Sequence, residues 1–142
     1  MDHYAELIEQ SYLSAVEKVG ETGIAEIVFD RFFESFPETR TLFDEETLST
    51  YFGRFKIKTI YEFFMDVVKY PDYGQVHFAQ EFLRHDSYGL RDKEYFFVLL
   101  DCFVMAIKQS LGPEWNADYE TAWNDVCMGM KPLIQEAAQV YQ

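Results

Sequence analysis

The sequence predicts an all-α protein of seven to eight helices, some of them very short. Apolar residues recur at intervals of three and four in every long segment, which is the spacing of one face of a helix. Glycine and proline separate these segments, and no segment alternates apolar and polar residues as a strand would. Residues 1–142 contain no repeat and no linker, so we expect a single domain.

Six long helices follow from this periodicity. They are expected at residues 3–19, 24–36, 50–69, 75–86, 92–110 and from residue 116 onwards. Gly20–Gly23 separates the first two, because glycine adopts backbone conformations that end a helix. Thr22 is a candidate N-cap for the second, since its hydroxyl can accept a bond from a free backbone N–H.

A short helical turn is expected between the second and third helices. Phe36 precedes Pro37, and the residue before a proline is pushed out of the helical region, so the second helix ends there. Pro37 is suited to the first position of a new helical turn, which we expect to end at Phe43. The polar residues 44–49 form a loop or a further turn.

The later helices differ in their surroundings and in how they end. Residues 70–74 have the composition of a turn. The helix at 92–110 is apolar on almost every side apart from Asp101, so we expect it to be central and buried on most sides. Leu111–Pro113 stops it, and Pro132 must bend or divide the last helix.

Composition narrows the function classes. Hydrophobic residues make up 49% of the chain, with 14 Phe and 10 Tyr, while the formal net charge is −13. An acidic surface repels phosphate groups, so we expect no nucleic-acid and no membrane partner. We find no signal stretch and no uninterrupted apolar run near 18 residues, and we expect a cytoplasmic protein with two reduced cysteines, Cys102 and Cys127.

One stretch carries the clearest candidate for chemistry. His85 lies in the last turn of its helix and shares an apolar face with Phe82. Gly89 allows a tight corner, after which Leu90 and Tyr95 return towards the histidine. Histidines on apolar faces are more often core residues than ligands, so this stretch alone leaves both roles open.

The order of these motifs resembles the globin family over essentially the whole chain. The matching segments are Val28–Phe33, Phe36–Phe43, His85–Tyr95, and Leu111–Trp115 followed by Ala122–Trp123. The chain is most similar to the globin domains of bacterial flavohaemoglobins, and His85–Leu90 is also similar to globin-coupled sensors. The resemblance implies a globin-like fold, a three-over-three helical sandwich.

The resemblance also implies a b-type haem, with His85 as the proximal iron ligand and Phe43 packed on the porphyrin. An axial histidine leaves the opposite position free for a diatomic gas: O2, CO or NO. The alternative is that the aromatic residues only pack against one another. The residues expected at the haem are Phe29, Phe43, Gly53, Lys56, Ile57, Ile60, Phe64, Phe82, Leu90, Tyr95 and Val98, and Cys102 is a further candidate for the cavity wall.

Two registers are open on the distal side. A gap-free match from Phe43 places Gly53 at the usual distal gate, which puts Lys58 on the buried wall. Counting back from His85 instead places Lys56 at the gate, Ile60 over the iron and Tyr61 against the core. The second register agrees better with the apolar face of the helix at residues 50–69, and we prefer it.

The distal donors usual in globins are absent in either register. Phe29 stands where bacterial relatives often carry tyrosine, so bound oxygen finds no hydrogen-bond donor, whereas CO and NO depend less on one. Lys56 has two alternative roles. It is an exposed amine paired with a haem propionate, or a distal donor or sixth ligand if burial lowers its pKa.

The proximal side also departs from the family. Glu81 lies one turn before His85 and either accepts the imidazole N–H, which would strengthen the histidine as an electron donor, or faces solvent. Tyr95 matches a flavohaemoglobin tyrosine that orients the proximal histidine, but its expected acidic partner appears as Gln139. His77 is an alternative ligand or a surface residue.

The sequence therefore predicts a haem globin that binds a diatomic gas for sensing, storage or nitric oxide and peroxide chemistry. We expect mainly a binding protein, with a minor peroxidase-like or nitric oxide activity for which a separate reductase would supply electrons. The alternative is a haem-free globin-fold sensor or interaction domain, and a phycobilin-bearing relative is a remote third. Aromatic residues such as Tyr4, Tyr12 and Trp115 are candidates for a homodimer patch.

Overall fold

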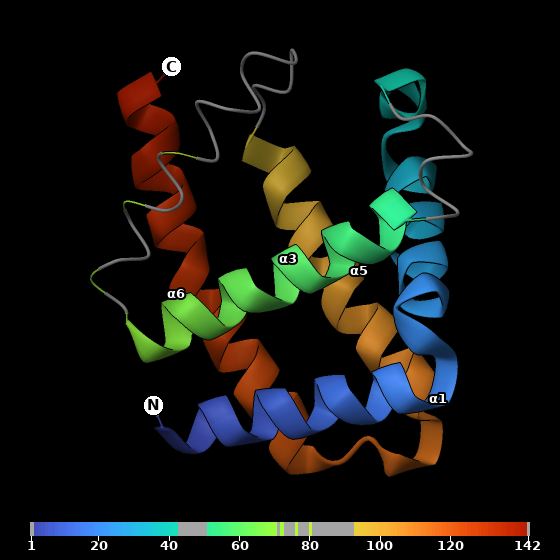
Figure 1. Cartoon of the computed structure of the whole chain (residues 1–142). Coiled ribbons are helices and arrows are strands. Elements are labelled where there is room, and N and C mark those ends of the chain that lie inside the picture. The colour runs from blue at the N-terminus through green and yellow to red at the C-terminus, as the bar shows by residue number, and fades with distance from the viewer. Residues whose placement is uncertain are drawn as a thin grey trace.

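The computed structural model describes residues 2–42, 51–70 and 93–141, together with positions 72, 76 and 80 (Figure 1). Within these residues all regular structure is helical, as predicted. The elements are α1 (Asp2–Ser35), the 3-10 helix η1 (Pro37–Leu42), α3 (Tyr51–Lys69), α5 (Lys93–Leu111), the 3-10 helix η2 (Gly112–Glu114) and α6 (Ala117–Tyr141). The count of seven to eight helices stays a prediction, because residues 43–50 and most of 71–92 lie outside this description.

The first two predicted helices form one continuous element with a sharp kink. Only Gly20 leaves the helical region, with φ 73° and ψ 164°, a conformation open almost only to glycine. The two halves of α1 run in different directions on either side of it (Figure 1). The predicted break is therefore correct in place but narrower than expected, and Thr22 lies within the helix, so its assignment as an N-cap was wrong.

Pro37 opens a short helical turn, as predicted. The backbone N–H of Phe36 donates to the carbonyl of Phe32 at 2.9 Å and completes the last turn of α1. Thr39 then donates from its backbone N–H and from its hydroxyl to the carbonyl of Phe36, at 3.0 and 2.7 Å. Two donors on one carbonyl hold η1 close to the end of α1. The predicted end at Phe43 lies outside the described residues.

The last two helices meet at the predicted corner. α5 ends at Leu111, Gly112 has a φ of 55°, and η2 leads into α6. Pro132 lies inside α6, which is continuous through it, so the helix is not divided there. The predicted helix at 75–86 lies outside the description apart from positions 76 and 80, which are helical and exposed.

α1 is the element against which the others pack: α3, α5, α6 and η1 all lie against it, and α6 also contacts α3 and α5. Side chains join α3 to α5, because the rings of Phe64 and Phe103 stack at 5.4 Å. The largest fully buried side chains come from all four long helices: Ile8, Ile24, Val28, Ile57, Phe64, Phe103, Ile107, Leu111, Trp123, Met130 and Ile134.

One stretch, Glu94–Glu114, is long and apolar enough to cross a membrane by length and composition, with a mean hydropathy of 1.4. It is not an uninterrupted apolar run, because Asp101 and Lys108 lie within it. A core helix of a soluble protein has the same composition. In this stretch Phe103, Ala106 and Ile107 are fully buried, but the apolar window as a whole is only 28% buried among the described residues.

Substituting the kink glycine tests how much the direction of α1 depends on it. We expect Gly20→Ala to lower the free energy of unfolding by about 1–3 kcal/mol, because a side chain at this φ and ψ is strained. Urea denaturation measures the change. Gly129→Ala is the matched control, since Gly129 is exposed within α6. Alanine there should raise the free energy of unfolding by about 0.5–1 kcal/mol. Equal shifts in the two variants would contradict the role of Gly20.

Candidate functional site

One face of α3 forms an apolar wall. Ile57 and Phe64 are fully buried and Ile60 is 8% exposed, while Lys58 on another face of the same helix is exposed. Val67 and Val68 continue this face to the end of the helix. The apolar spacing in the sequence therefore predicted the buried face of α3 correctly.

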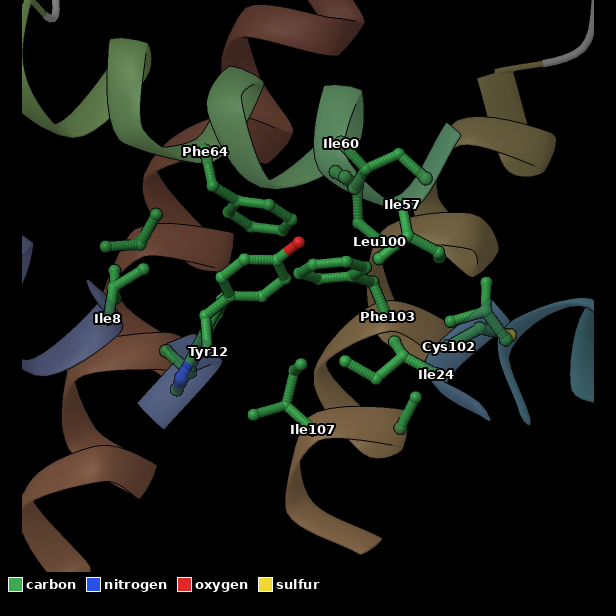
Figure 2. Packing of buried hydrophobic residues seen from close by; sticks show 14 of the residues in the cluster. Ile8, Tyr12, Ile24, Ile57, Ile60, Phe64, Leu100, Cys102, Phe103 and Ile107 are labelled. Atoms are coloured by element: carbon green, nitrogen blue, oxygen red, sulfur yellow. The ribbon is translucent and has the colours of Figure 1, made fainter. Parts of the chain in front are cut away.

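An aromatic cluster supports this wall from below (Figure 2). Tyr12 of α1 stacks on Tyr61 of α3, with ring centroids 3.8 Å apart and an interplanar angle of 6°. Phe103 of α5 stacks on Phe64, and the edge of Trp123 of α6 meets Phe64 at 5.1 Å. Rings from four helices thus meet at one place, and offset or edge contacts of this kind are favourable beyond the area they bury.

The aromatic cluster contains two polar groups, the indole N–H of Trp123 and the hydroxyl of Tyr12, and only the first has a hydrogen-bond partner among the described residues. The indole N–H of Trp123 donates to the hydroxyl of Ser11 at 2.9 Å, and that hydroxyl donates to the carbonyl of Ile8 at 3.0 Å. The hydroxyl of Tyr12 is buried and has no hydrogen-bond partner in the described part of the chain. Burial raises the pKa of the Tyr12 phenol strongly, so this residue stays neutral.

The burial of Tyr12 corrects one prediction. We expected Tyr4, Tyr12 and Trp115 to be surface residues, but Tyr12 is only 4% exposed because α3 and α5 cover it. Tyr4 is half-buried and donates its hydroxyl proton to Asp125 at 2.5 Å. Trp115 is half-buried and donates its indole N–H to Glu120. Tyr12 is therefore removed from the candidate dimer patch.

The distal candidates lie at the start of α3. Gly53 and Lys56 belong to its first two turns, and the side chain of Lys56 lies outside the described residues. Lys58 is exposed, and Tyr61 packs against Tyr12 in the core. The exposed Lys58 does not fit the buried wall that the register with Gly53 at the gate requires. Which residue stands at the gate stays a prediction.

Phe29 faces the core from the second half of α1. It is 5% exposed, and its ring stacks on that of Phe33 at 6.0 Å. Phe29, Ile57, Ile60 and Phe64 carry no polar side-chain atom, so these four residues offer no hydrogen-bond donor to anything placed beside them.

The first half of α5 is less buried than predicted. Tyr95, Phe96, Phe97, Val98 and Leu99 are all half-buried, whereas the second half of the helix enters the core. The prediction that this helix is buried on most sides is therefore wrong for its first two turns. The described helices pack mainly against its second half, which leaves half-buried apolar side chains near its start.

Tyr95 makes a contact that the sequence did not predict. Its hydroxyl donates to the carboxylate of Glu38 in η1, with 3.2 Å between the two oxygens. Its ring meets Phe36 edge to face, at 4.6 Å and 89°. A phenol has one proton to donate, so any contact of this hydroxyl with His85 would use the oxygen as an acceptor. The sequence did not predict the role of Glu38, because the two residues are 57 positions apart and the apolar spacing of a helix does not show which distant residue it contacts.

Both cysteines are free thiols. Cys102 is 6% exposed, and burial followed by the nearby Asp101 raises its pKa to about 11. Burial likewise raises the pKa of the half-buried Cys127 to about 12. Neutral thiols of this kind are poor nucleophiles and poor metal ligands, and they agree with the predicted reduced cysteines.

Several predicted site residues lie outside the described part of the chain: Phe43, Glu81, Phe82, His77, His85 and Leu90. Gln139, the expected partner of Tyr95, is exposed on α6. Among the described residues no three His, Cys, Asp or Glu side chains come together as a metal site. The assignment of His85 as a ligand thus stays a prediction.

Comparison with known families identifies the fold. The family model described as Globin matches residues 27–130, which is more than half of the chain. The chain belongs to the globin family. A search of curated proteins found no match. The predicted family is confirmed, and in this globin the match runs from the last nine residues of α1 through η1, α3 and α5 to about the middle of α6.

The thiol of Cys102 predicts a pH dependence of stability. Its pKa in the folded globin lies above that of an unfolded thiol, so the folded state holds the proton more tightly. Stability is therefore complete below about pH 8.5 and falls as the pH rises towards 11, by at most about 1.4 kcal/mol per pH unit for this group.

Urea denaturation between pH 8 and 11 measures this slope. Cys102→Ala should flatten the decline relative to the unsubstituted globin, because alanine has no proton to lose. The unsubstituted globin and the Cys102→Ala variant have the same tyrosines, so tyrosine ionisation cancels when the two stability profiles are subtracted. Parallel profiles for the two chains would rule out Cys102 as a source of the decline.

Proposed function

We propose that this globin binds a b-type haem through His85 and holds a diatomic gas at the opposite coordination position. The observation that carries the proposal is the match to the globin family. The matched residues include the apolar face of α3, which is buried and has no hydrogen-bond donors among its side chains. Globins commonly bind haem, and His85 occupies the position that the family resemblance assigns to the proximal ligand.

The described side chains fit such a group. A porphyrin is a flat apolar macrocycle, and it needs apolar walls that keep water from the iron. Ile57, Ile60 and Phe64 on α3, with Phe29 on α1, supply aliphatic and aromatic surface. The half-buried stretch from Tyr95 to Leu99 adds apolar side chains at the start of α5.

The bound haem would supply an iron atom with one position open to a gas. The residues of this chain would then decide which gas is held. Phe29 and Ile60 exclude water and donate no hydrogen bond, so they do not stabilise the partial negative charge of bound oxygen. We therefore propose that CO and NO are held more firmly than O2, relative to a globin with a distal tyrosine. Lys56, at the proposed gate, would pair with a propionate at the rim.

The absorption spectrum is the direct test. We expect the purified, haem-loaded globin to show a Soret band that shifts when CO is added to the ferrous form. His85→Ala should change the ferrous spectrum, because the iron loses its proximal ligand. His77→Ala is the matched control and should leave the spectrum unchanged. A colourless protein that takes up no haem in titration would instead support the haem-free sensor or interaction domain.

Restoring a distal donor tests the role of Phe29. We expect Phe29→Tyr to slow the dissociation of O2 about tenfold or more, because the new hydroxyl can donate to the bound ligand. CO dissociation should change little. Stopped-flow ligand replacement gives both rates.

Phe33→Tyr is the control for this substitution. Phe33 is buried one helical turn further along α1, and the guanidinium of Arg40 lies 5.1 Å from its ring centroid. A hydroxyl added there should leave the O2 rate unchanged. If the two variants slowed O2 release equally, Phe29 would not be the residue nearest the ligand.

A further inference from the structure

We propose that Glu38 and Tyr95 form a latch that helps to hold the haem in this globin by joining η1 to the start of α5. The inference rests on the proposed function and gives Tyr95 a role other than the one that the family resemblance implies. Tyr95 acts here as a positioning residue, through η1.

The latch has a polar and an aromatic part. The Tyr95 hydroxyl donates to the exposed Glu38 carboxylate at 3.2 Å, which is long for an O–H donor, so the bond is a modest one. The ring of Tyr95 lies edge-on to Phe36 at 4.6 Å and to Phe32 at 6.3 Å. The aromatic contacts orient the ring, and the hydrogen bond fixes the position of η1 along it.

The two halves of the latch lie close in sequence to the two residues proposed to contact the haem. η1 ends at Leu42, and the next residue is Phe43, the proposed ring on the porphyrin. α5 begins at Lys93, eight positions after His85, the proposed iron ligand. The latch therefore ties together the segments that lead to both proposed haem contacts.

Contacts to two helices hold η1. Thr39 and the carbonyl of Phe36 hold it to α1, and Arg40 lies over the ring of Phe33, also on α1. The hydroxyl of Tyr95 binds η1 from α5. Removing it should loosen η1 from α5 while leaving its attachment to α1 in place.

The first measurement uses the haem-free chain. Hydrogen exchange of the η1 amides reports local opening, and we expect Tyr95→Phe to speed it about threefold to fivefold, the effect of losing one exposed hydrogen bond. Glu38→Ala should have the same effect, and the double variant no more than either. Glu38→Gln should stay within about twofold, because its amide oxygen still accepts the bond. Tyr70→Phe, at an exposed tyrosine beyond α3, is the control and should leave η1 unchanged.

The second measurement uses the haem-loaded globin. We expect haem transfer to a competing haem-free globin to be about threefold to fivefold faster for Tyr95→Phe and Glu38→Ala, with rescue in Glu38→Gln. A purely structural role of the ring would leave the transfer rate insensitive to the hydroxyl and would not show this rescue.

The two measurements separate the possible failures. Unchanged η1 exchange in Tyr95→Phe, or additive effects in the double variant, would overturn the latch. Loosened η1 with unchanged haem transfer would overturn its role in holding haem. A chain that takes up no haem would overturn the proposed function, while the exchange measurement would still decide whether the latch exists.

Discussion

The stacking of Tyr12 on Tyr61 is the contact on which the arrangement of the helices depends. It joins the first half of α1 to the middle of α3, and Phe64, Phe103 and Trp123 extend the same aromatic layer to α5 and α6 (Figure 2). Aromatic rings bury large areas and pack in restricted geometries, so they fix the rotation of a helix more tightly than aliphatic side chains do. Among the described residues the buried hydroxyl of Tyr12 finds no hydrogen-bond partner, which costs stability at this point.

This contact also determines which residues α3 presents to the proposed haem pocket. With Tyr61 against the core, Ile60 lies beside Leu100 and Ile57 in the interior, while Lys58 reaches solvent (Figure 2). A rotation that buried Lys58 would place a charge among aromatic rings, which costs stability. Packing of the core and the apolar face that α3 presents thus have a common origin in the orientation of one helix.

Much of the fold was predictable because each helix carries its own signals. The bounds of α3 and α5 agree with the periodicity of their apolar residues, and Pro37 and Gly112 mark real transitions. Errors arose where tertiary contacts outweigh local preference. Thr22 has the chemistry of a cap, yet the kink needs only Gly20, and the helix resumes at once because both halves of α1 pack on other helices. Tyr12 looked like a candidate surface aromatic until α3 covered it.

The candidate site divides in the same way. The sequence by itself determined the family, the apolar face of α3 and the lack of a tyrosine at position 29, because these depend on residue type and spacing along one chain segment. Only the tertiary structure decided that Tyr61 stacks on Tyr12 and that Tyr95 donates to Glu38. Those pairs are distant in the sequence, and periodicity tells which face of a helix is buried but not which side chain it meets.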